Sequence, residues 1–569
     1  MKEVLKNDWP YLILAIALLG LSILSIDSFR FGFHTAFDQA YMLLKLQEAY
    51  DGSYITGKSQ WNLLAIHLFP YLDLTNKANS YLAANILNWI TILIATFTAM
   101  RLYDKKRGLM YFAIIFLIYF YNANRGMGLS YVTMQGSLLC WALCSFALSY
   151  NSLSPKVKYP LAFVTGVLLG CCWFVIIPGA ALVSSGVLLL IILTYWSKPV
   201  AMLKYAGAGL LGILSTLVIV HLLVCPLNEI VQAMHETAQV FTKESNYDGG
   251  SMIRMYASFI RHLVLMMASF AGIYYLSTLF KNKMVGQVVY VLLCLVYVYY
   301  TPKDRIDPFM AISSLVCIPY LFSIANESGF RLTDTRTYYR LFLFLLPILA
   351  VAGTNTGVLG RLYLFVLPWL FLYFETIKKE NKYKELLWPI LVLFLIPSAG
   401  FGNMSPLSTI QANRAVKAAN PYHFEKGNAN FSQIGITKTQ FEYFEQIDTL
   451  LQKYNYIPRQ STMFALAYDY SNIYVFNAVN VSHFLMAQYF PYMDVSQTTA
   501  PDFMFLCRYD SVAIGEALHA APWGWPEEYD KYMVGCPEDT TIPTWYNLPD
   551  ISTRYLYCRR SLRKETAND

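Results

Sequence analysis

Long, mainly apolar stretches recur along this chain from Trp9 to Ala399, and nothing comparable follows Gly400. An α-helix needs about 20 such residues to cross the hydrocarbon of a bilayer. Because 56% of the residues are hydrophobic and only 14% are charged, lipid must be the solvent for most of the chain. The pattern predicts a polytopic α-helical membrane protein followed by a C-terminal domain outside the bilayer.

Judged by length and apolarity, about thirteen stretches qualify as transmembrane helices. The first stands behind Lys2 and Lys6 like a signal peptide, but no clear small-residue cleavage site follows, so we interpret it as a retained helix. The pair around Pro178 is either two spans or a re-entrant or broken helix, so the count of thirteen is open by one or two. The predicted spans are residues 9–27, 80–101, 108–121, 135–150, 159–177, 179–196, 205–225, 256–279, 284–300, 308–325, 341–353, 362–376 and 386–400.

The basic residues of the loops predict the orientation, because short loops rich in Lys and Arg stay in the cytoplasm. Alternate loops carry them, on the side of the amino terminus: 105–107, 156–158, 198–204, 281–283, 331–340 and 378–384. The first long loop, 28–79, and everything after residue 400 then face outward. We therefore predict a transmembrane domain of residues 1–400 and an extracytoplasmic domain of residues 401–569. The net charge of +7 is scattered over these loops without a basic stripe, so no nucleic acid is expected as a partner.

Periodicity predicts the elements outside the bilayer. In the first long loop an apolar face opposes a polar one, which predicts an amphipathic helix at the membrane interface: Phe37, Ala40 and Leu44 against Asp38, Tyr41, Lys45 and Glu48. A second interfacial helix is expected at residues 61–69. In the C-terminal domain a helical stretch at 438–453 alternates with strand-like runs at 463–467, 472–476, 503–507 and 555–558, which is typical of an α/β domain.

Three cysteines lie in the C-terminal domain, at Cys507, Cys536 and Cys558. If this domain faces an oxidising compartment, two of them are able to pair, and the sequence leaves open which two.

Two further patterns in this domain each have a functional and a structural interpretation. An aromatic-rich part of the domain either stacks on sugar rings or packs inside the domain, and packing is the commoner role: Trp523, Trp525, Trp545 and Tyr546. Three Asn-x-Ser sequons matter only if the domain faces the lumen of an endoplasmic reticulum: they begin at Asn403, Asn430 and Asn480.

Asp38 is the most suggestive single residue, because it follows the first span by about a dozen residues in a helix expected at the membrane surface. A carboxylate at that height reaches the level where a membrane-anchored substrate presents its reactive carbon. The alternative is that Asp38 lies on a solvated face or pairs with Lys45, as exposed acids commonly do.

Taken together, these features resemble the glycosyltransferase-C superfamily, which comprises polytopic enzymes that use lipid-phosphate sugar donors. The resemblance covers the topology of the whole chain: a first helix, a long outer loop with an acid in the phrase Phe37 to Tyr41, interfacial helices, many spans and an outer C-terminal domain. Support comes from Gly353-Thr-Asn-Thr-Gly357 before Arg361 and from the phrase Tyr468 to Tyr474.

The resemblance implies an enzyme that transfers a sugar from a polyprenyl-phosphate-linked donor to a lipid, glycan or protein acceptor on the extracytoplasmic face. Asp38 is then the general base. The leaving phosphate needs cationic partners near the outer surface, and ordinary anchoring to headgroups is the alternative role of such residues. The substrate-binding candidates are Arg361, Arg125, Arg305, Lys58, His67 and Asn355.

A divalent metal has no clear motif in this sequence. Many members of the superfamily carry two adjacent acids in the first loop, whereas here Gln39 follows Asp38. Acids that are able to substitute are Asp51, Glu244 and Asp248. The sequence therefore identifies no cofactor.

Two other functions fit a chain of this size, and a non-catalytic scaffold of the same fold also stays open, because no second acid is identified. A lipid-linked glycan transporter or flippase needs charged or polar residues in the middle of its spans, and these spans hold few. A polymerase or ligase of the O-antigen type usually relies on Arg residues in a large outer loop late in the chain. The resemblance favours the transferase, in a bacterial inner membrane with the amino terminus in the cytoplasm.

Overall fold

The computed structural model describes the greater part of the chain, in segments separated by gaps. The described residues are 2–32, 43–44, 46–48, 74–124, 128–152, 154–223, 226–228, 230–231, 235, 249–301, 335–351, 365–379, 414–465, 470–481, 499–507, 512–535 and 554–564.

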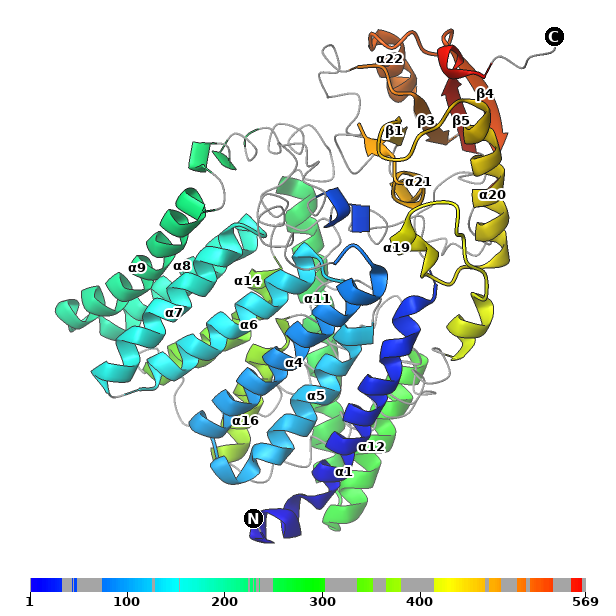
Figure 1. Ribbon diagram of the computed structural model, residues 1–569. Coiled ribbons are helices and arrows are strands. Elements are labelled where there is room, and N and C mark those ends of the chain that lie inside the picture. The colour runs from blue at the N-terminus through cyan, green and yellow to red at the C-terminus, as the bar shows by residue number, and fades with distance from the viewer. Residues whose placement is uncertain are drawn as a thin grey trace.

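A bundle of long helices forms the first part of the molecule (Figure 1). Its described helices are α1 (Lys2–Ser25), α4 (Lys77–Leu102), α5 (Gly108–Asn124), α6 (Tyr131–Tyr150), α7 (Pro155–Trp173), α8 (Ile177–Tyr195), α9 (Pro199–Leu223), α11 (Gly249–Thr278), α12 (Lys283–Tyr300), α14 (Thr335–Ala350) and α16 (Leu367–Lys379).

Seven of these helices are long and apolar enough to cross a membrane. Together with their composition, this confirms the prediction of a polytopic helical membrane protein. The chain forms two helices around Pro178, because α7 ends at Trp173 and Pro178 occupies the first turn of α8, where a missing N–H costs nothing. Two predicted spans, 308–325 and 386–400, lie outside the described residues, so the count of thirteen stays a prediction.

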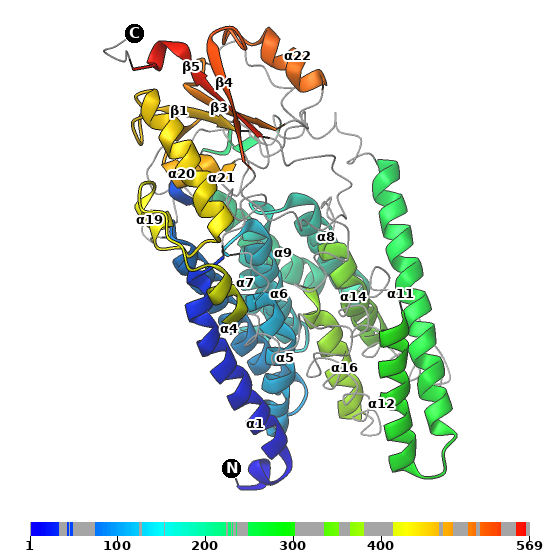
Figure 2. The ribbon, with the colours of Figure 1, turned by 90° about the vertical axis from the view of Figure 1, so that its right-hand side faces the viewer.

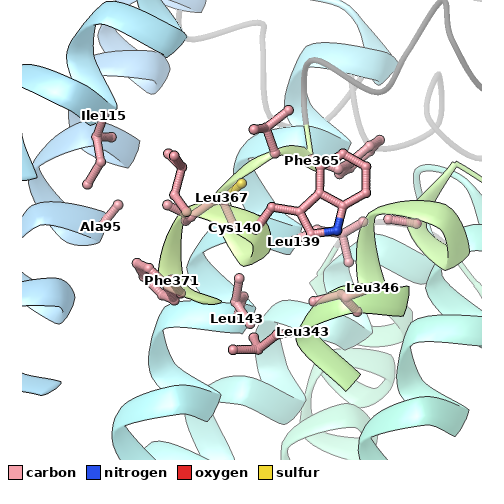
Figure 3. Close-up of a cluster of buried hydrophobic side chains, with 14 of the residues drawn as sticks. Ala95, Ile115, Leu139, Cys140, Leu143, Leu343, Leu346, Phe365, Leu367 and Phe371 are labelled. Carbon is pink, nitrogen blue, oxygen red and sulfur yellow. The ribbon is translucent and has the colours of Figure 1, made fainter. Parts of the chain in front are cut away.

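The core of the bundle lies where α4, α5, α6, α14 and α16 meet. Figure 3 shows part of it, with side chains contributed by all five helices: Ala95, Ile115, Leu139, Cys140, Leu143, Leu343, Leu346, Phe365, Leu367 and Phe371. Beside it, α7 and α9 approach so closely that a Cβ atom at Gly166 or Gly212 would collide with the backbone of the other helix. Small residues allow such an approach between helices in lipid, where packing and not water drives association.

The basic turns gather at one end of the bundle, as the alternation of charged loops predicts. Lys378 donates to the carbonyl oxygen of Leu102 (3.1 Å), which joins the ends of α16 and α4. The Tyr150 hydroxyl donates to the Thr335 carbonyl oxygen (3.2 Å), which joins the end of α6 to the start of α14. Figure 2 shows the amino terminus and the turn between α11 and α12 at the end away from the strands. Which end faces the cytoplasm stays a prediction from the basic residues.

The C-terminal domain is a mixed α/β structure at the other end of the bundle (Figures 1 and 2). Its five-stranded sheet has the order β2-β1-β3-β5-β4, parallel among the first three strands and antiparallel among the last three. The elements are α19 (Ala429–Ser432), α20 (Lys438–Lys453), β1 (Thr462–Ala465), α21 (Tyr470–Phe476), β2 (Val479–Asn480), β3 (Phe503–Cys507), α22 (Val512–Ala520), β4 (Tyr529–Val534) and β5 (Arg554–Arg559).

Alternation along the strands supplies both faces of this sheet. Phe503 and Phe505 of β3 lie in one buried cluster with Phe444 of α20, while Met504 lies in the opposite cluster with Leu518 of α22. Successive side chains of a strand point to opposite faces, so a continuous apolar run marks a strand buried on both sides.

The predicted helix at 438–453 is confirmed as α20, and three of the strand predictions are confirmed by β1, β3 and β5. The strand predicted at 472–476 is wrong, because these residues belong to helix α21, which connects the parallel strands β1 and β2. Ser471 to Phe476 are buried, at most 2% exposed, so packing on every side overrides the strand preference of Ile473 and Val475.

Candidate functional site

The residues that the sequence singles out as a site lie outside the part of the chain that the structure describes. These residues are Asp38, Lys58, His67, Arg125, Arg305, Asn355 and Arg361. Their roles therefore stay predictions. The structure does describe the chain on both sides of Asp38, and there the first long loop meets the C-terminal domain. We call these contacts the junction.

The first part of the junction lies just before the segment that contains Asp38. Phe31 forms a parallel bridge with Gly435, and the Gly32 and Gly435 amides donate in turn to the carbonyl oxygens of Gly435 (2.8 Å) and Arg30 (2.7 Å). A Cβ atom at Gly435 would collide with the Phe31 ring and with the backbone of Asn420. Only glycine permits this approach, which fixes the end of the first helix to the C-terminal domain.

Lys77 holds the same point from the side of α4. Its side chain is buried, and its ammonium donates to the carbonyl oxygen of Phe31 (2.6 Å) and also to that of Gly32. The ammonium also lies 5.3 Å from the centre of the Tyr81 ring. A buried charge must be compensated by hydrogen bonds, and here backbone carbonyls and an aromatic face supply the compensation.

The residues before α4 form the second part of the junction. The Tyr474 hydroxyl donates to the carbonyl oxygen of Thr75 (2.7 Å), and the Asn430 amide donates to the Thr75 hydroxyl (2.6 Å). The Asn76 amide donates to the side chain of Gln433 (2.7 Å), while its oxygen caps α4. The chain is thus attached to the C-terminal domain where it leaves the first long loop.

A short helical segment inside the first loop forms the third part. We call residues 43–44 and 46–48 the loop helix; it belongs to the region where the sequence predicts an amphipathic helix, and it is helical. Leu43 and Leu44 are 2% and 3% exposed and belong to the core of the C-terminal domain, with Phe431. Leu46, 3% exposed, belongs to the core of the bundle. The loop helix is therefore shared between two hydrophobic cores.

The polar side of the loop helix faces the C-terminal domain and not water. Asn428 donates to the side-chain oxygen of Gln47 (2.7 Å), and the Gln47 amide donates to the side chain of Asn477. The Asn480 amide donates to a carboxylate oxygen of Glu48 (2.6 Å). Gln47, Glu48 and Asn480 are 5–7% exposed. A hydrogen bond to an ionised carboxylate is about twice as strong as one between neutral groups, and burial protects it from competition by water.

Most of the junction could not be found in the sequence. Glu48 is on the predicted polar face, but its buried partner is hundreds of residues away, and Gln47 and Lys77 have no local signal. Asn430 and Asn480 were noticeable only as sequons. In the structure both amides donate hydrogen bonds to the first loop, so neither is available for attachment of a glycan in the folded protein.

Among the aromatic residues proposed for sugar stacking, Trp523 and Trp525 differ in the structure, and Trp545 and Tyr546 lie outside the described residues. Trp523 is 3% exposed and packs edge-on against Phe464, with ring centres 5.2 Å apart, so the packing interpretation holds for it. Trp525 is half-buried between the rings of His519 (4.7 Å) and Tyr557 (5.8 Å). Because part of the Trp525 ring is exposed, stacking on a sugar stays a prediction for this residue.

Strand register excludes one of the disulfides that the sequence leaves open. In the β3–β5 pair, Cys507 lies opposite Arg554 and Cys558 lies opposite Phe503. The two cysteines are therefore at opposite ends of the ladder, on the order of 13 Å apart along the strands, beyond the reach of a disulfide. Cys558 is a free, buried thiol, and burial raises its pKa. Cys536 lies outside the described residues.

Within the described segments, no group of three His, Cys, Asp or Glu side chains is able to hold a metal ion. The acids that the sequence offers for a metal are Asp38, Asp51, Glu244 and Asp248, and they lie in the gaps between these segments. The metal therefore stays unknown.

No protein-family model and no curated protein matches the chain. It is similar to two crystal structures of the oligosaccharyltransferase of Archaeoglobus fulgidus, one with zinc and sulfate and one in the apo form. Identity is 12% and 11%, the TM-scores are 0.43 and 0.42, and each match covers 83% of this chain. The chain spans only 62% and 64% of the length of these two relatives.

It is also similar to the crystal structure of ArnT from Cupriavidus metallidurans bound to undecaprenyl phosphate. That match has 10% identity and a TM-score of 0.41, and covers 98% of this chain and 99% of ArnT.

Proposed function

We propose that the protein is a membrane glycosyltransferase that transfers a sugar from a polyprenyl-phosphate-linked donor to a lipid, glycan or protein acceptor, with Asp38 as the general base. The observation that carries the proposal is the junction, which attaches the chain on both sides of Asp38 where the bundle meets the C-terminal domain.

The proposed reaction is a direct displacement. The Asp38 carboxylate takes the proton of an acceptor hydroxyl while that oxygen forms a bond to the anomeric carbon. The bond between this carbon and the phosphate oxygen breaks, and the polyprenyl phosphate leaves with the electron pair. Cationic side chains then stabilise the leaving phosphate, and polar ones bind sugar hydroxyls. We assign the first role to Arg361, Arg125, Arg305 and Lys58, and the second to His67 and Asn355.

A transporter for a lipid-linked glycan is the second candidate. The bundle holds a cavity between α6, α7, α8 and α14, and apart from the Thr165 hydroxyl and the Cys140 thiol, the described side chains that line it are hydrocarbon. Thr165 is already hydrogen-bonded to Ser145 (2.8 Å) and to the Leu161 carbonyl oxygen. The described lining of this cavity therefore offers no charged partner to a glycan.

The proposed setting is a bacterial inner membrane with the amino terminus in the cytoplasm. The basic end of the bundle then faces inward, and the C-terminal domain, with the junction, faces outward. We propose a division into a transmembrane domain of residues 1–400 and an extracytoplasmic domain of residues 401–569, and the membrane lipids are permanent partners of the first. Whether the transferred sugar is a hexose or a pentose is left to the donor screen below.

The test follows transfer of radiolabelled sugar from a panel of undecaprenyl-phosphate-linked sugars to extracted membrane lipids, glycans and proteins, with the purified chain in detergent. Wild type is compared with Asp38→Asn, which removes the base and keeps the shape. Asp27→Asn is the matched control, because Asp27 is an acid directly before the same loop, 60% exposed and paired with Lys417 at 2.9 Å.

We expect Asp38→Asn to lower the transfer rate by about a hundredfold or more, the usual worth of a positioned general base, and Asp27→Asn to leave it unchanged. If both variants transfer at the wild-type rate, the base is another residue. If wild type transfers from none of the donors while its melting curve shows a folded protein, the transferase proposal is wrong and the transporter becomes the leading candidate.

A further inference from the structure

We propose that the C-terminal domain binds a sugar unit of the acceptor at the edge of its sheet where β1 and β3 end, and that Asn472 and Arg554 hold the hydroxyls of this sugar. The inference deepens the proposed function, because it names the acceptor as a glycan, and it rests on that function for the purpose of the binding. The site itself stands on the topology of the sheet and on two buried polar side chains.

The connections of the sheet reverse direction between β1 and β3. From β1 the chain passes through α21 to the neighbouring parallel strand β2, and from β3 it passes through α22 to β4, at the other edge of the sheet. Helix α21 contributes residues 473–476 to the buried cluster of Phe503 and Phe505. Helix α22 contributes Leu518 to the cluster of Met504, on the opposite face. In open sheets with such a reversal, ligands bind outside the carboxyl ends of the two strands, which here are the ends of β1 and β3.

Two polar side chains lie at this edge, on the face of the sheet that carries α20 and α21. Arg554 is the first residue of β5 and lies opposite Cys507, the last residue of β3. Side chains two residues apart in a strand share a face, so Arg554 lies on the face of Leu556, which belongs to the cluster of α20 and α21. Asn472 lies in the first turn of α21, which starts at the same edge. Arg554 and Asn472 are both 0% exposed.

Only half of the Asn472 amide is hydrogen-bonded within the part of the chain that the structure describes. Its nitrogen donates to the hydroxyl of Tyr443 in α20 (2.9 Å), which fixes the orientation of the amide. Its oxygen is buried and has no hydrogen-bond donor there. A buried acceptor is costly to leave without a donor, so this oxygen points to a bound water or to a ligand.

The chemistry of the two side chains identifies the class of ligand. The guanidinium of Arg554 donates hydrogen bonds and accepts none, whereas the side-chain oxygen of Asn472 accepts and never donates. A ligand that contacts both must therefore present acceptor and donor atoms close together, and each hydroxyl of a sugar is both. A fully ionised anion such as sulfate offers acceptors to Arg554 but no donor to Asn472. The pair therefore favours a sugar over an inorganic anion.

This edge of the sheet faces the helical bundle. Asn480, the last residue of β2, lies at the same edge and donates to Glu48 of the loop helix (2.6 Å). Figures 1 and 2 show α21 between the sheet and the bundle. A sugar at this edge is therefore held on the side of the domain that faces the membrane, where the proposed donor is anchored. The half-buried Trp525 packs against the cluster of α22, on the opposite face, so it belongs to a different surface.

The first experiment measures binding of fluorescently labelled oligosaccharides to the full chain in detergent, by fluorescence anisotropy and without any donor. The panel contains trisaccharides of glucose, N-acetylglucosamine, xylose and rhamnose. We expect at least one of them to bind, and the unlabelled trisaccharide but not sodium sulfate to compete with it. Arg554→Met and Asn472→Leu remove the polar groups at similar volume. Each should weaken binding about tenfold or more, because each removes a hydrogen bond to the sugar in a place shielded from water.

Arg559→Met is the matched control for Arg554→Met. Arg559 is the last residue of the same strand, and its side chain is 33% exposed and paired with Glu528 at 3.2 Å. This variant should bind the trisaccharide as wild type does.

A second experiment needs no variant and therefore decides the question if Arg554→Met and Asn472→Leu do not fold. Hydrogen exchange of wild type is compared with and without the trisaccharide that binds best. Exchange should slow in peptides that cover residues 470–477 and 554–559 and stay unchanged in peptides that cover residues 519–529, around Trp525. Protection confined to residues 519–529 would assign the sugar to the surface of Trp525 and overturn the inference.

The outcomes separate this inference from the proposed function. If the trisaccharide binds through Arg554 and Asn472 while wild type transfers from none of the donors, the sugar site stands and the transferase proposal fails. If no member of the panel binds, or if folded Arg554→Met and Asn472→Leu bind as wild type does, the sugar site is wrong, whether or not the protein transfers sugar. The oxygen of Asn472 is then the partner of a buried water only.

Discussion

The hydroxyl of Tyr474 donates a hydrogen bond of 2.7 Å to the carbonyl oxygen of Thr75, although the two residues belong to different halves of the chain. Both are buried, at 0% and 1% exposed. Thr75 stands directly before the cap of α4, so this bond attaches the start of a membrane helix to the C-terminal domain. This hydrogen bond joins the helical bundle to the C-terminal domain independently of the loop helix.

Tyr474→Phe should therefore destabilise the protein by about 1–3 kcal/mol, because the Thr75 carbonyl oxygen loses its tyrosine donor in a place that water does not reach. Tyr422→Phe is the control, since the Tyr422 side chain is 37% exposed. The measurement is thermal unfolding of both variants in the same detergent. Equal unfolding of the two variants would mean that the junction does not depend on this hydroxyl.

Gly212→Ala should separate α7 from α9. A Cβ atom at Gly212 would collide with the carbonyl oxygen of Phe163, and no side chain is available there to move aside. Overpacking of this kind costs about 1–3 kcal/mol. Gly207→Ala in the same helix meets nothing within 4 Å and should be tolerated. Apparent melting temperature and the yield of monodisperse protein report the difference, and a tolerated Gly212→Ala would contradict the close approach.

Glu375 stabilises the basic end of the bundle. Its carboxylate pairs with Arg336 (2.7 Å) and Arg340 (3.2 Å), and both Glu375 and Arg340 are buried. Removing one partner of a buried ion pair costs about 3–5 kcal/mol, because the other charge stays behind.

We therefore expect Glu375→Gln to lower thermal stability strongly. Asp27→Asn, which breaks the exposed pair with Lys417, should change stability by less than about 1 kcal/mol. Comparable melting temperatures for the two variants would show that the buried Glu375 ion pair contributes no more to stability than the exposed pair of Asp27 and Lys417.

Asp530 should make the C-terminal domain sensitive to acid. Burial raises the pKa of this carboxyl. Hydrogen bonds from Tyr454 (2.5 Å) and Arg560 (2.9 Å), together with the nearby positive charge, lower the pKa by more than burial raises it, so the net shift is downward. A lowered pKa in the folded state contributes stability above the unfolded value of about 4, and this stability is lost as the pH falls through the folded pKa.

Asp530→Asn should accordingly be less stable than wild type at pH 7, and the difference should shrink as the pH falls below about 4. Thermal unfolding between pH 3 and pH 7 measures it. Glu442→Gln removes an exposed acid that pairs with Lys438 along its own helix, and serves as the control. A constant stability difference between Asp530→Asn and wild type over this range would show that the lost stability does not depend on the charge of Asp530.

The helices could be predicted from the sequence because their signal is local. Apolarity over the length of a bilayer marks α4, α6 or α9 without knowledge of any neighbour, and a Thr437–Gln440 capping box marks the start of α20. Helix α21, in contrast, could not be predicted from its local sequence. Its composition favours a strand, and only its place between β1 and β2, with burial on all sides, makes it helical.

The junction could not be predicted, because its partners are distant in the chain and its residue types are ordinary. Nothing in the phrase around Gln47 indicates its two partners, Asn428 before α19 and Asn477 between α21 and β2. The predicted catalytic residues differ in another way. Asp38 and Arg361 were inferred from position and resemblance, and a test of their geometry needs a structure with a bound polyprenyl phosphate.

The shared loop helix has a consequence for how the protein is made. Leu43 and Leu44 leave the ribosome hundreds of residues before Phe431 and Ile434, whose core they complete. During synthesis these two leucines have no partners until the C-terminal domain has been made. The hydrophobic core of that domain therefore forms only after the last part of the chain has been synthesised. A gene divided at the boundary near residue 400 would yield two incomplete products. The N-terminal product would expose Leu43 and Leu44 to solvent, and the C-terminal product would lack these two side chains in its hydrophobic core.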